Sequence, residues 1–130
     1  MYRILIVDDE KIERTGLRLL LGKMDQKFEI TEAVNGKEAL EWLSCNRADI
    51  LVTDIRMPFM DGLELSRMVK AELPDIKIVI LSGYNDFEYA KEAIKIGVTE
   101  YLLKPMSGAQ LLEAVHKVAE TILAEKEQQD

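Results

Sequence analysis

The sequence predicts an α/β fold, a three-layer, doubly wound sandwich in which helices cover both faces of a five-stranded parallel sheet. Five short apolar segments, most of them rich in β-branched residues, begin at residues 4, 28, 50, 76 and 101, which is the pattern of buried strands. Stretches of helical length and spacing separate them. Because the strands are apolar almost throughout, both faces must be covered, and this favours a parallel sheet between two helical layers.

The first half of the chain is predicted to alternate strand, helix, strand, helix. The strand Ile4–Val7 is followed by a helix that ends at Gly22, since glycine commonly ends helices. The strand Phe28–Ala33 is followed by Asn35 and, three residues later, by Glu38, a pairing that begins helices. The apolar stripes with helical spacing are Ile12, Gly16, Leu19 and Leu20 in the first helix and Ala39, Leu40, Trp42 and Leu43 in the second.

The alternation continues through the third and fourth strands. The strand Ile50–Thr53 is followed by a third helix, and the strand Ile76–Leu81 leads into a fourth. Asn85 and Glu88 have the same capping spacing and predict where the fourth helix begins, while Gly97 predicts where it ends.

The last strand and helix complete the predicted domain. The strand Tyr101–Leu103 precedes Ser107 and Gln110, a third capping pair. The helix after it becomes polar toward its end with no glycine or proline stop, so we expect a compact domain over residues 1–120. Residues 121–130 are expected to be the end of the last helix or a linker toward a further domain. The apolar positions of this helix are Leu111, Leu112, Val115, Val118, Ala119 and Ile122.

Composition excludes several classes of protein. The 130 residues carry a formal net charge of -7, so the surface as a whole repels nucleic acid and anionic lipid. A single cysteine, Cys45, forms no intramolecular disulfide, and a single histidine, His116, builds no multi-histidine metal site. No uncharged apolar stretch approaches the roughly 20 residues that span a bilayer. We therefore expect a cytoplasmic domain that makes no direct contact with nucleic acid or membrane.

Polar residues follow four of the five predicted strands. Asp8 and Asp9 follow the first strand, Asp54 the third, Ser82 the fourth and Lys104 the fifth. Ligands of parallel α/β sheets bind at the carboxyl ends of the strands, where these side chains should meet. Crowded carboxylates repel one another unless a cation lies among them, and Mg²⁺ prefers oxygen ligands. The ammonium and hydroxyl groups remain to bind an anion beside the metal.

This set of groups suits phosphoryl transfer, in which the protein positions the reactants and neutralises charge. Asp54 is the expected nucleophile, because carboxylates form aspartyl phosphates and this one ends a rigid apolar strand. Each residue taken alone also has an ordinary explanation as a helix cap, a turn residue or a solvated strand end. The combination is what favours the functional interpretation.

Four segments together resemble the receiver domains of two-component response regulators, over essentially the whole chain. These are ILIVDDE at 4–10, DIRMPFMDG at 54–62, SGY at 82–84 and YLLKP at 101–105. The resemblance implies a flavodoxin-like, CheY-like fold with strand order 2-1-3-4-5. It also implies that Asp54 accepts a phosphoryl group from a phosphohistidine of a sensor histidine kinase. In such a domain Asp9 ligates Mg²⁺ directly, Asp8 acts mostly through water, and Asp54 and the main-chain carbonyl of Arg56 complete the protein ligands.

The resemblance also implies a conformational switch. Lys104 pairs with one phosphoryl oxygen and Ser82 donates a hydrogen bond to another, and the Lys104–Pro105 bond is usually cis in the family. Movement of Ser82 toward the phosphoryl group then lets Tyr101 turn inward. The face formed by the fourth helix, fifth strand and fifth helix changes shape and contacts an output domain, a second receiver or, in a phosphorylation-dependent homodimer, a second copy.

Residues 82–90 and 93–98 resemble the receivers that precede AraC-type DNA-binding domains, which predicts transcriptional control by a domain outside this chain. We expect a signalling domain, not an enzyme, with slow autodephosphorylation. A stand-alone receiver that acts on a protein partner is the main alternative. A Mg²⁺-dependent phosphohydrolase is disfavoured because it would need a second carboxylate two residues after Asp54, where this chain has Arg56. A flavodoxin-like electron carrier is disfavoured because Asp8 and Asp9 would repel the phosphate of its cofactor. A degenerate, constitutive interaction module is disfavoured because all the polar groups are present.

Overall fold

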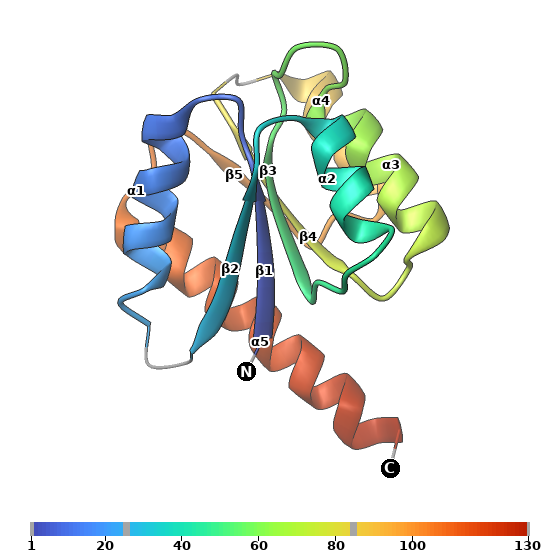
Figure 1. The fold of residues 1–130 in the computed structure, drawn as a ribbon. Helices are drawn as coiled ribbons and strands as arrows, with labels where there is room; N and C mark the ends of the chain where they lie inside the picture. Colours follow the sequence, from blue (N-terminus) through green and yellow to red (C-terminus); the bar gives the residue numbers. More distant parts are fainter. Residues whose placement is uncertain (1, 25–26, 84–85, 130) are drawn as a thin grey trace.

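The computed structural model describes residues 2–24, 27–83 and 86–129 and contains five strands and five helices that alternate along the chain (Figure 1). The strands are β1 (Tyr2–Val7), β2 (Phe28–Ala33), β3 (Ile50–Asp54), β4 (Lys77–Ser82) and β5 (Glu100–Leu103). The helices are α1 (Lys11–Leu21), α2 (Gly36–Leu43), α3 (Gly62–Glu72), α4 (Phe87–Ile96) and α5 (Gly108–Gln129). The predicted alternation is confirmed, with strand ends shifted by one or two residues.

All four strand pairings are parallel, and the strand order is β2-β1-β3-β4-β5. Helices α1 and α5 cover one face of the sheet, and α2, α3 and α4 cover the other (Figure 1). The expected doubly wound, three-layer architecture and its strand order are therefore confirmed. Because every connection between parallel strands crosses over through a helix, the carboxyl ends of all five strands lie at one edge of the sheet.

The core consists of two apolar clusters, one on each face of the sheet. Alternate residues of β1 divide between them: Leu5 and Val7 pack with α2, α3 and α4, whereas Ile4 and Ile6 pack with α1 and α5. The central strands are almost fully buried, which accounts for their uninterrupted apolar sequences. This packing fixes the residues at the ends of β1, β3 and β4, and those residues carry the polar groups.

The helix caps agree with the sequence in two of three cases. The side chain of Asn35 accepts from the N–H of Glu38, and the hydroxyl of Ser107 accepts from the N–H of Gln110. The third prediction is wrong. Helix α4 begins at Phe87 and its cap is Asp86, whose carboxylate accepts from the N–H of Glu88, while Asn85 lies outside the described residues. Gly22 and Gly97 end α1 and α4 as expected, Gly97 with a left-handed φ of 93°.

Helix α1 lies at the predicted place but turns a different face to the sheet. Ile12 and Leu19 are 85% and 65% exposed, and the buried residues are Leu17 and Leu21. Burial of Leu17 and Leu21, which lie one turn apart, turns this face of the helix toward the core. In this orientation Arg14 and Arg18 both donate to the carboxylate of Glu32 on β2, at 3.0 and 2.8 Å.

Helix α5 is 22 residues long and projects past the sheet at the edge opposite the carboxyl ends of the strands (Figure 1). Two contacts hold its distal part against the body. Lys77 on β4 pairs with Glu125 at 2.8 Å, and the ammonium of Lys126 lies 5.5 Å from the ring centre of Tyr2. Across residues 2–24, 27–83 and 86–129, no helix is both long and apolar enough to cross a membrane.

Candidate functional site

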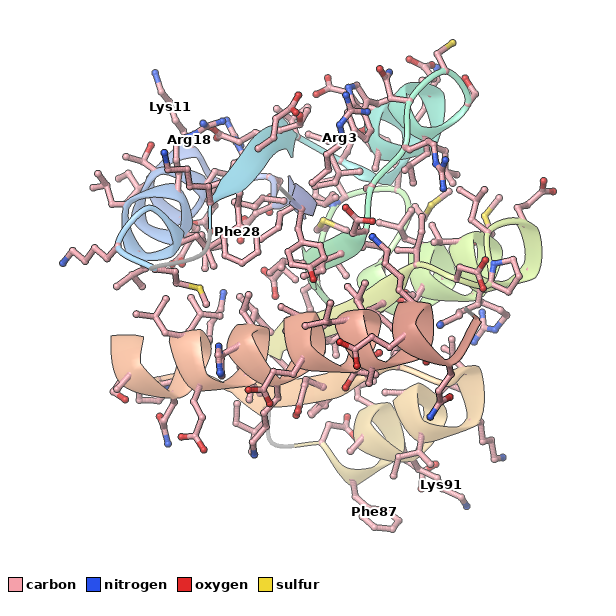
Figure 2. All side chains as sticks on the ribbon, turned by 90° about the horizontal axis from the view of Figure 1, so that it is seen from below. Arg3, Lys11, Arg18, Phe28, Phe87 and Lys91 are labelled. Carbon is pink, nitrogen blue, oxygen red and sulfur yellow. The ribbon has the colours of Figure 1, made fainter. Side chains whose placement is uncertain are left out.

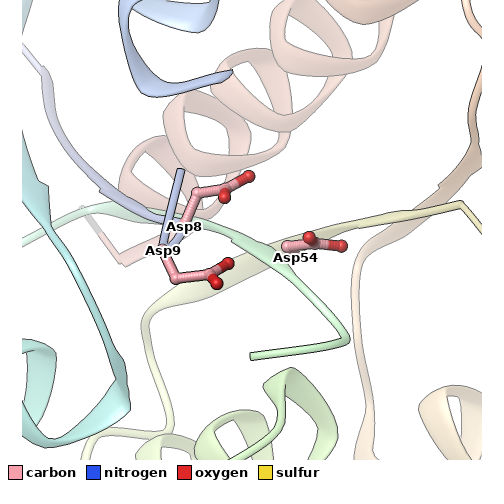
Figure 3. A group of neighbouring side chains, drawn as sticks. All are labelled: Asp8, Asp9 and Asp54. Atoms are coloured by element: carbon pink, nitrogen blue, oxygen red, sulfur yellow. The ribbon is translucent and has the colours of Figure 1, made fainter. Parts of the chain in front are cut away.

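Three carboxylates meet at the carboxyl edge of the sheet. Asp8 and Asp9 directly follow β1, and Asp54 is the last residue of β3. The two strands are neighbours and Val7 is paired with Thr53, so the residues that follow them come together. One oxygen from each carboxylate lies within 4.8 Å of the others, and all three side chains point into the same space (Figure 3).

The environments of Asp8 and Asp54 oppose ionisation of their carboxyl groups. Asp8 is 2% exposed, and burial is the main cause that raises its pKa to about 6, with a further contribution from the charge of Asp54. Its carboxylate accepts from the N–H of Glu10 at 2.9 Å, which partly offsets the rise. The pKa of Asp54 is also raised, mainly by burial and against the opposing effect of Lys104. Two carboxylates with raised pKa values therefore adjoin a third.

The chemistry of the donor set fits a hard divalent cation. Three carboxylates supply only oxygen ligands, and a cation among them would offset the repulsion between their negative charges. Asp9 is exposed, so the cluster is open to solvent on one side. The side chain of Arg56, two residues after Asp54, is also exposed.

A cation from the protein adjoins the cluster. The ammonium of Lys104 lies 3.9 Å from Oδ2 of Asp54, and the Lys104–Pro105 bond is cis, as expected. The N–H of Lys104 donates to the main-chain oxygen of Ser82 at 2.7 Å, which ties the end of β5 to the end of β4. Ser82 is fully buried at the end of β4, one residue beyond the partner of Asp54 in the sheet register. Lys104 thus lies near the carboxylate of Asp54, and Ser82 ends the neighbouring strand at the same edge of the sheet.

Tyr101 lies on β5 with its ring against the apolar cluster under α4. Its hydroxyl oxygen is buried and has no hydrogen-bond partner among the described residues. A buried hydroxyl without a partner loses its hydrogen bonds to water and gains none in return.

We expect Tyr101→Phe to raise the free energy of unfolding by about 1 kcal/mol, because it removes the unpartnered hydroxyl and keeps the ring. Urea denaturation of the metal-free chain measures the change. Tyr89→Phe is the matched control, since Tyr89 packs against the same cluster. A loss of stability in Tyr101→Phe would show that the hydroxyl is hydrogen-bonded in solution.

Two residues that hold the site in place were not identified from the sequence. Arg14 donates to the main-chain oxygen of Asp8 at 2.8 Å as well as to Glu32, and so braces the turn that carries Asp8 and Asp9. Glu13, beside it, lies 3.8 Å from the ammonium of Lys104. Both occupy the first turn of α1, which begins two residues after Asp9. That short distance along the chain is the signal that could have placed them at the site.

Gly62 closes the loop after β3. Its N–H donates to the main-chain oxygen of Ile55 at 2.7 Å, and a Cβ atom at this position would overlap the main-chain oxygen of Asp54. Asp61 caps α3 from the same loop. The loop therefore lies directly against the backbone of the acceptor residue, an approach that only glycine allows.

Comparison with known proteins agrees with this geometry. The transcriptional regulatory protein YesN of Bacillus subtilis (strain 168), described as uncharacterized, is 42% identical over all of this chain and 34% of its own length. The receiver (REC) domain of AraT, a response regulator from Geobacillus stearothermophilus, is 39% identical with a TM-score of 0.83, covering 96% of this chain and 98% of that one. A two component transcriptional regulator AraC from Clostridium phytofermentans ISDg is 33% identical with a TM-score of 0.86, and the match covers 98% of this chain and 99% of that one.

The chain spans only a third of the length of YesN, so the activity of a whole regulator does not follow from this match. The family model described as the response regulator receiver domain matches residues 4–116. This range includes every strand end that carries a polar group of the site. The chain belongs to the response regulator receiver domain family of two-component systems.

Proposed function

We propose that this receiver domain is a phosphorylation-dependent switch, in which Asp54 accepts a phosphoryl group from a sensor histidine kinase in a Mg²⁺-dependent reaction. The observation that carries the proposal is the position of Asp54. Its carboxylate lies at the end of a buried strand, beside two further carboxylates and 3.9 Å from the ammonium of Lys104. A carboxylate nucleophile beside a cluster of carboxylates that suits a cation and beside an ammonium suits phosphoryl transfer.

In the proposed reaction an oxygen of Asp54 attacks the phosphorus of a phosphohistidine. The new O–P bond forms as the P–N bond breaks, and the imidazole nitrogen leaves with the bonding electron pair. Asp9, Asp54 and the main-chain oxygen of Arg56 would hold Mg²⁺, with Asp8 acting mostly through water. The bound ion supplies positive charge beside the phosphoryl oxygens. Lys104 balances the charge of one phosphoryl oxygen, and the hydroxyl of Ser82 donates to another.

Phosphorylation would then act on the face formed by α4, β5 and α5. Ser82 moves toward the new acceptor oxygens, and Tyr101, whose ring already packs beneath α4, adjusts to the space that Ser82 leaves. Phe87 and Lys91 project outward from α4, and Phe87 is 76% exposed (Figure 2). This face therefore offers apolar surface to an output domain, a second receiver or a second copy of the chain.

We further propose a cytoplasmic transcriptional regulator in which residues 1–120 form the receiver and residues 121–130 lead toward a DNA-binding output domain. The names of the relatives support this output, since YesN is a transcriptional regulatory protein. The net charge of -7 makes direct DNA contact by this chain unfavourable. The chain would act as a signalling domain that loses its phosphoryl group slowly by hydrolysis.

Intact-mass spectrometry after incubation with Mg²⁺ and phosphoramidate tests the phosphorylation step. The parent chain is expected to gain one phosphoryl mass, and both Asp54→Asn and omission of Mg²⁺ are expected to abolish the gain. Asp49→Asn is the matched control, because Asp49 precedes the opposite end of the same strand, where its carboxylate accepts from the N–H of Arg3. An unmodified parent chain with Mg²⁺ and several donors would contradict the proposal.

A further inference from the structure

Lys104 lies between two carboxylates at nearly equal distances. Its ammonium is 3.9 Å from Asp54 on β3 and 3.8 Å from Glu13 on α1. Neither distance is that of a direct hydrogen bond, so the ammonium is shared between the two groups. The side chain of Asp54 is 18% exposed and that of Glu13 is 47% exposed. Lys104 therefore has one partner inside the site and a second at its mouth.

The electrostatic effect of Glu13 reaches the acceptor. The negative charge of Glu13 is among the causes that raise the pKa of Asp54, after burial and the charge of Asp9. Glu13 occupies the first turn of α1, and Arg14 anchors that turn to the main-chain oxygen of Asp8. The backbone of Glu13 is consequently held near the site by the same contact that braces the turn carrying Asp8 and Asp9.

We propose that Glu13 is a positioning residue that competes with the incoming phosphoryl group for Lys104. This inference rests on the proposed phosphorylation of Asp54 and adds a control over which donors react. To contact a phosphoryl oxygen, the ammonium of Lys104 must move away from the carboxylate of Glu13. A negatively charged donor must also approach past that carboxylate. Both effects slow the reaction, and both grow with the negative charge of the donor.

Small phosphodonors separate this effect from kinase docking. Near neutral pH acetyl phosphate carries close to two negative charges, whereas phosphoramidate carries one. Glu13→Gln keeps the size of the side chain and removes its charge. We expect it to raise the rate of phosphorylation by acetyl phosphate about three- to tenfold at low salt, and the rate with phosphoramidate by less. The gain should shrink at high salt, because the side chain of Glu13 is half-exposed and its charge is screened.

The matched control is Glu10→Gln, which removes the same charge three residues earlier, at the exposed position that precedes α1. Only Glu13→Gln should produce the donor-dependent acceleration. Equal acceleration in both variants would overturn the proposal, because it would show that net charge, and not competition for Lys104, sets the rate. An unchanged rate in Glu13→Gln would overturn it as well.

A second measurement needs no phosphorylation. The ammonium ¹⁵N signal of Lys104 in the metal-free chain reports its ion pairs, through its chemical shift and its exchange with water. We expect Glu13→Gln to shift this signal and speed the exchange, and Glu10→Gln to leave both unchanged. If the signal responds while no donor phosphorylates the chain, the proposed function fails and the shared ion pair stands. A signal that does not respond overturns the sharing of Lys104 whatever the chain does with phosphodonors.

Discussion

Asp8→Asn is expected to stabilise the metal-free chain at pH 7 by about 3 kcal/mol, although it removes a residue of the site. In the folded chain the pKa of Asp8 is about 6, against 3.8 for the unperturbed group, chiefly because the side chain is buried. Ionising it in the folded state at pH 7 is therefore costly. Asparagine removes the charge and keeps the oxygen that accepts from the N–H of Glu10.

The sign of this effect gives a pH dependence. The unfolded chain loses the Asp8 proton near pH 3.8, while the folded chain keeps it until about pH 6. Between these values the folded state binds more protons, so the contribution of Asp8 to stability falls as the pH rises and is constant above about 6. The difference in the free energy of unfolding between Asp8→Asn and the parent should be small at pH 3.5 and reach its full size by pH 7.

Urea denaturation in a chelator, across this pH range, measures the difference in the free energy of unfolding. Repeating it with Mg²⁺ separates the two roles of the residue: the parent should gain stability from the ion, and the variant should gain much less. Asp75→Asn, on the exposed loop before β4, is the control for loss of one charge. A variant less stable than the parent at pH 7 would mean that the carboxylate is not strained by burial.

Gly62→Ala is expected to destabilise the chain by about 3 kcal/mol and to slow phosphorylation. The added methyl group would overlap the main-chain oxygen of Asp54, and its other close neighbours are also backbone atoms, of Asp54 and Ile55. Backbone cannot swing aside as the end of a flexible side chain can. The loop must lift from β3, which displaces the acceptor residue and lengthens the hydrogen bond from Gly62 to Ile55.

Gly16→Ala provides the matched control within the same chain. Gly16 is an exposed residue inside α1, and a Cβ atom there would meet nothing within 4 Å. Alanine favours helix over glycine, so this variant should be more stable than the parent by up to about 1 kcal/mol. Denaturation midpoints of the two variants are expected to move in opposite directions. If Gly62→Ala and Gly16→Ala had the same denaturation midpoint, the loop after β3 would accommodate the added methyl group.

The sequence was sufficient for the fold because its local and global patterns agree. Apolar strands at regular intervals, capping pairs at Asn35 and Ser107, and glycines at Gly22 and Gly97 all indicate the same alternation. Polar residues directly after apolar strands then placed Asp8, Asp54 and the others at one edge. These features depend on neighbours in sequence or on the rule that parallel strands share a direction.

Other features depend on contacts between distant segments and could not be found this way. The rotation of α1 buries Leu17 and Leu21 and brings Arg14 and Arg18 to Glu32 on β2, a contact between distant segments that the predicted apolar stripe does not reveal. The proximity of Glu13 to Lys104 follows from that rotation. The start of α4 was misplaced because Asn85 and Asp86 are both good capping residues, and their spacing to Glu88 alone does not choose between them.

Because α5 is one continuous helix, a small change in its direction at one end moves its other end by a larger distance. Its 22 residues extend about 33 Å, from the edge of the sheet that carries Lys104 to beyond the opposite edge (Figure 1). A tilt of about 5° at the first turn moves the far end by about 3 Å, which is comparable to the length of a hydrogen bond. The contacts of Glu125 with Lys77 and of Lys126 with Tyr2 hold the far end of the helix in its present position. A small tilt near Lys104 would therefore appear as a larger displacement at the opposite end of the molecule.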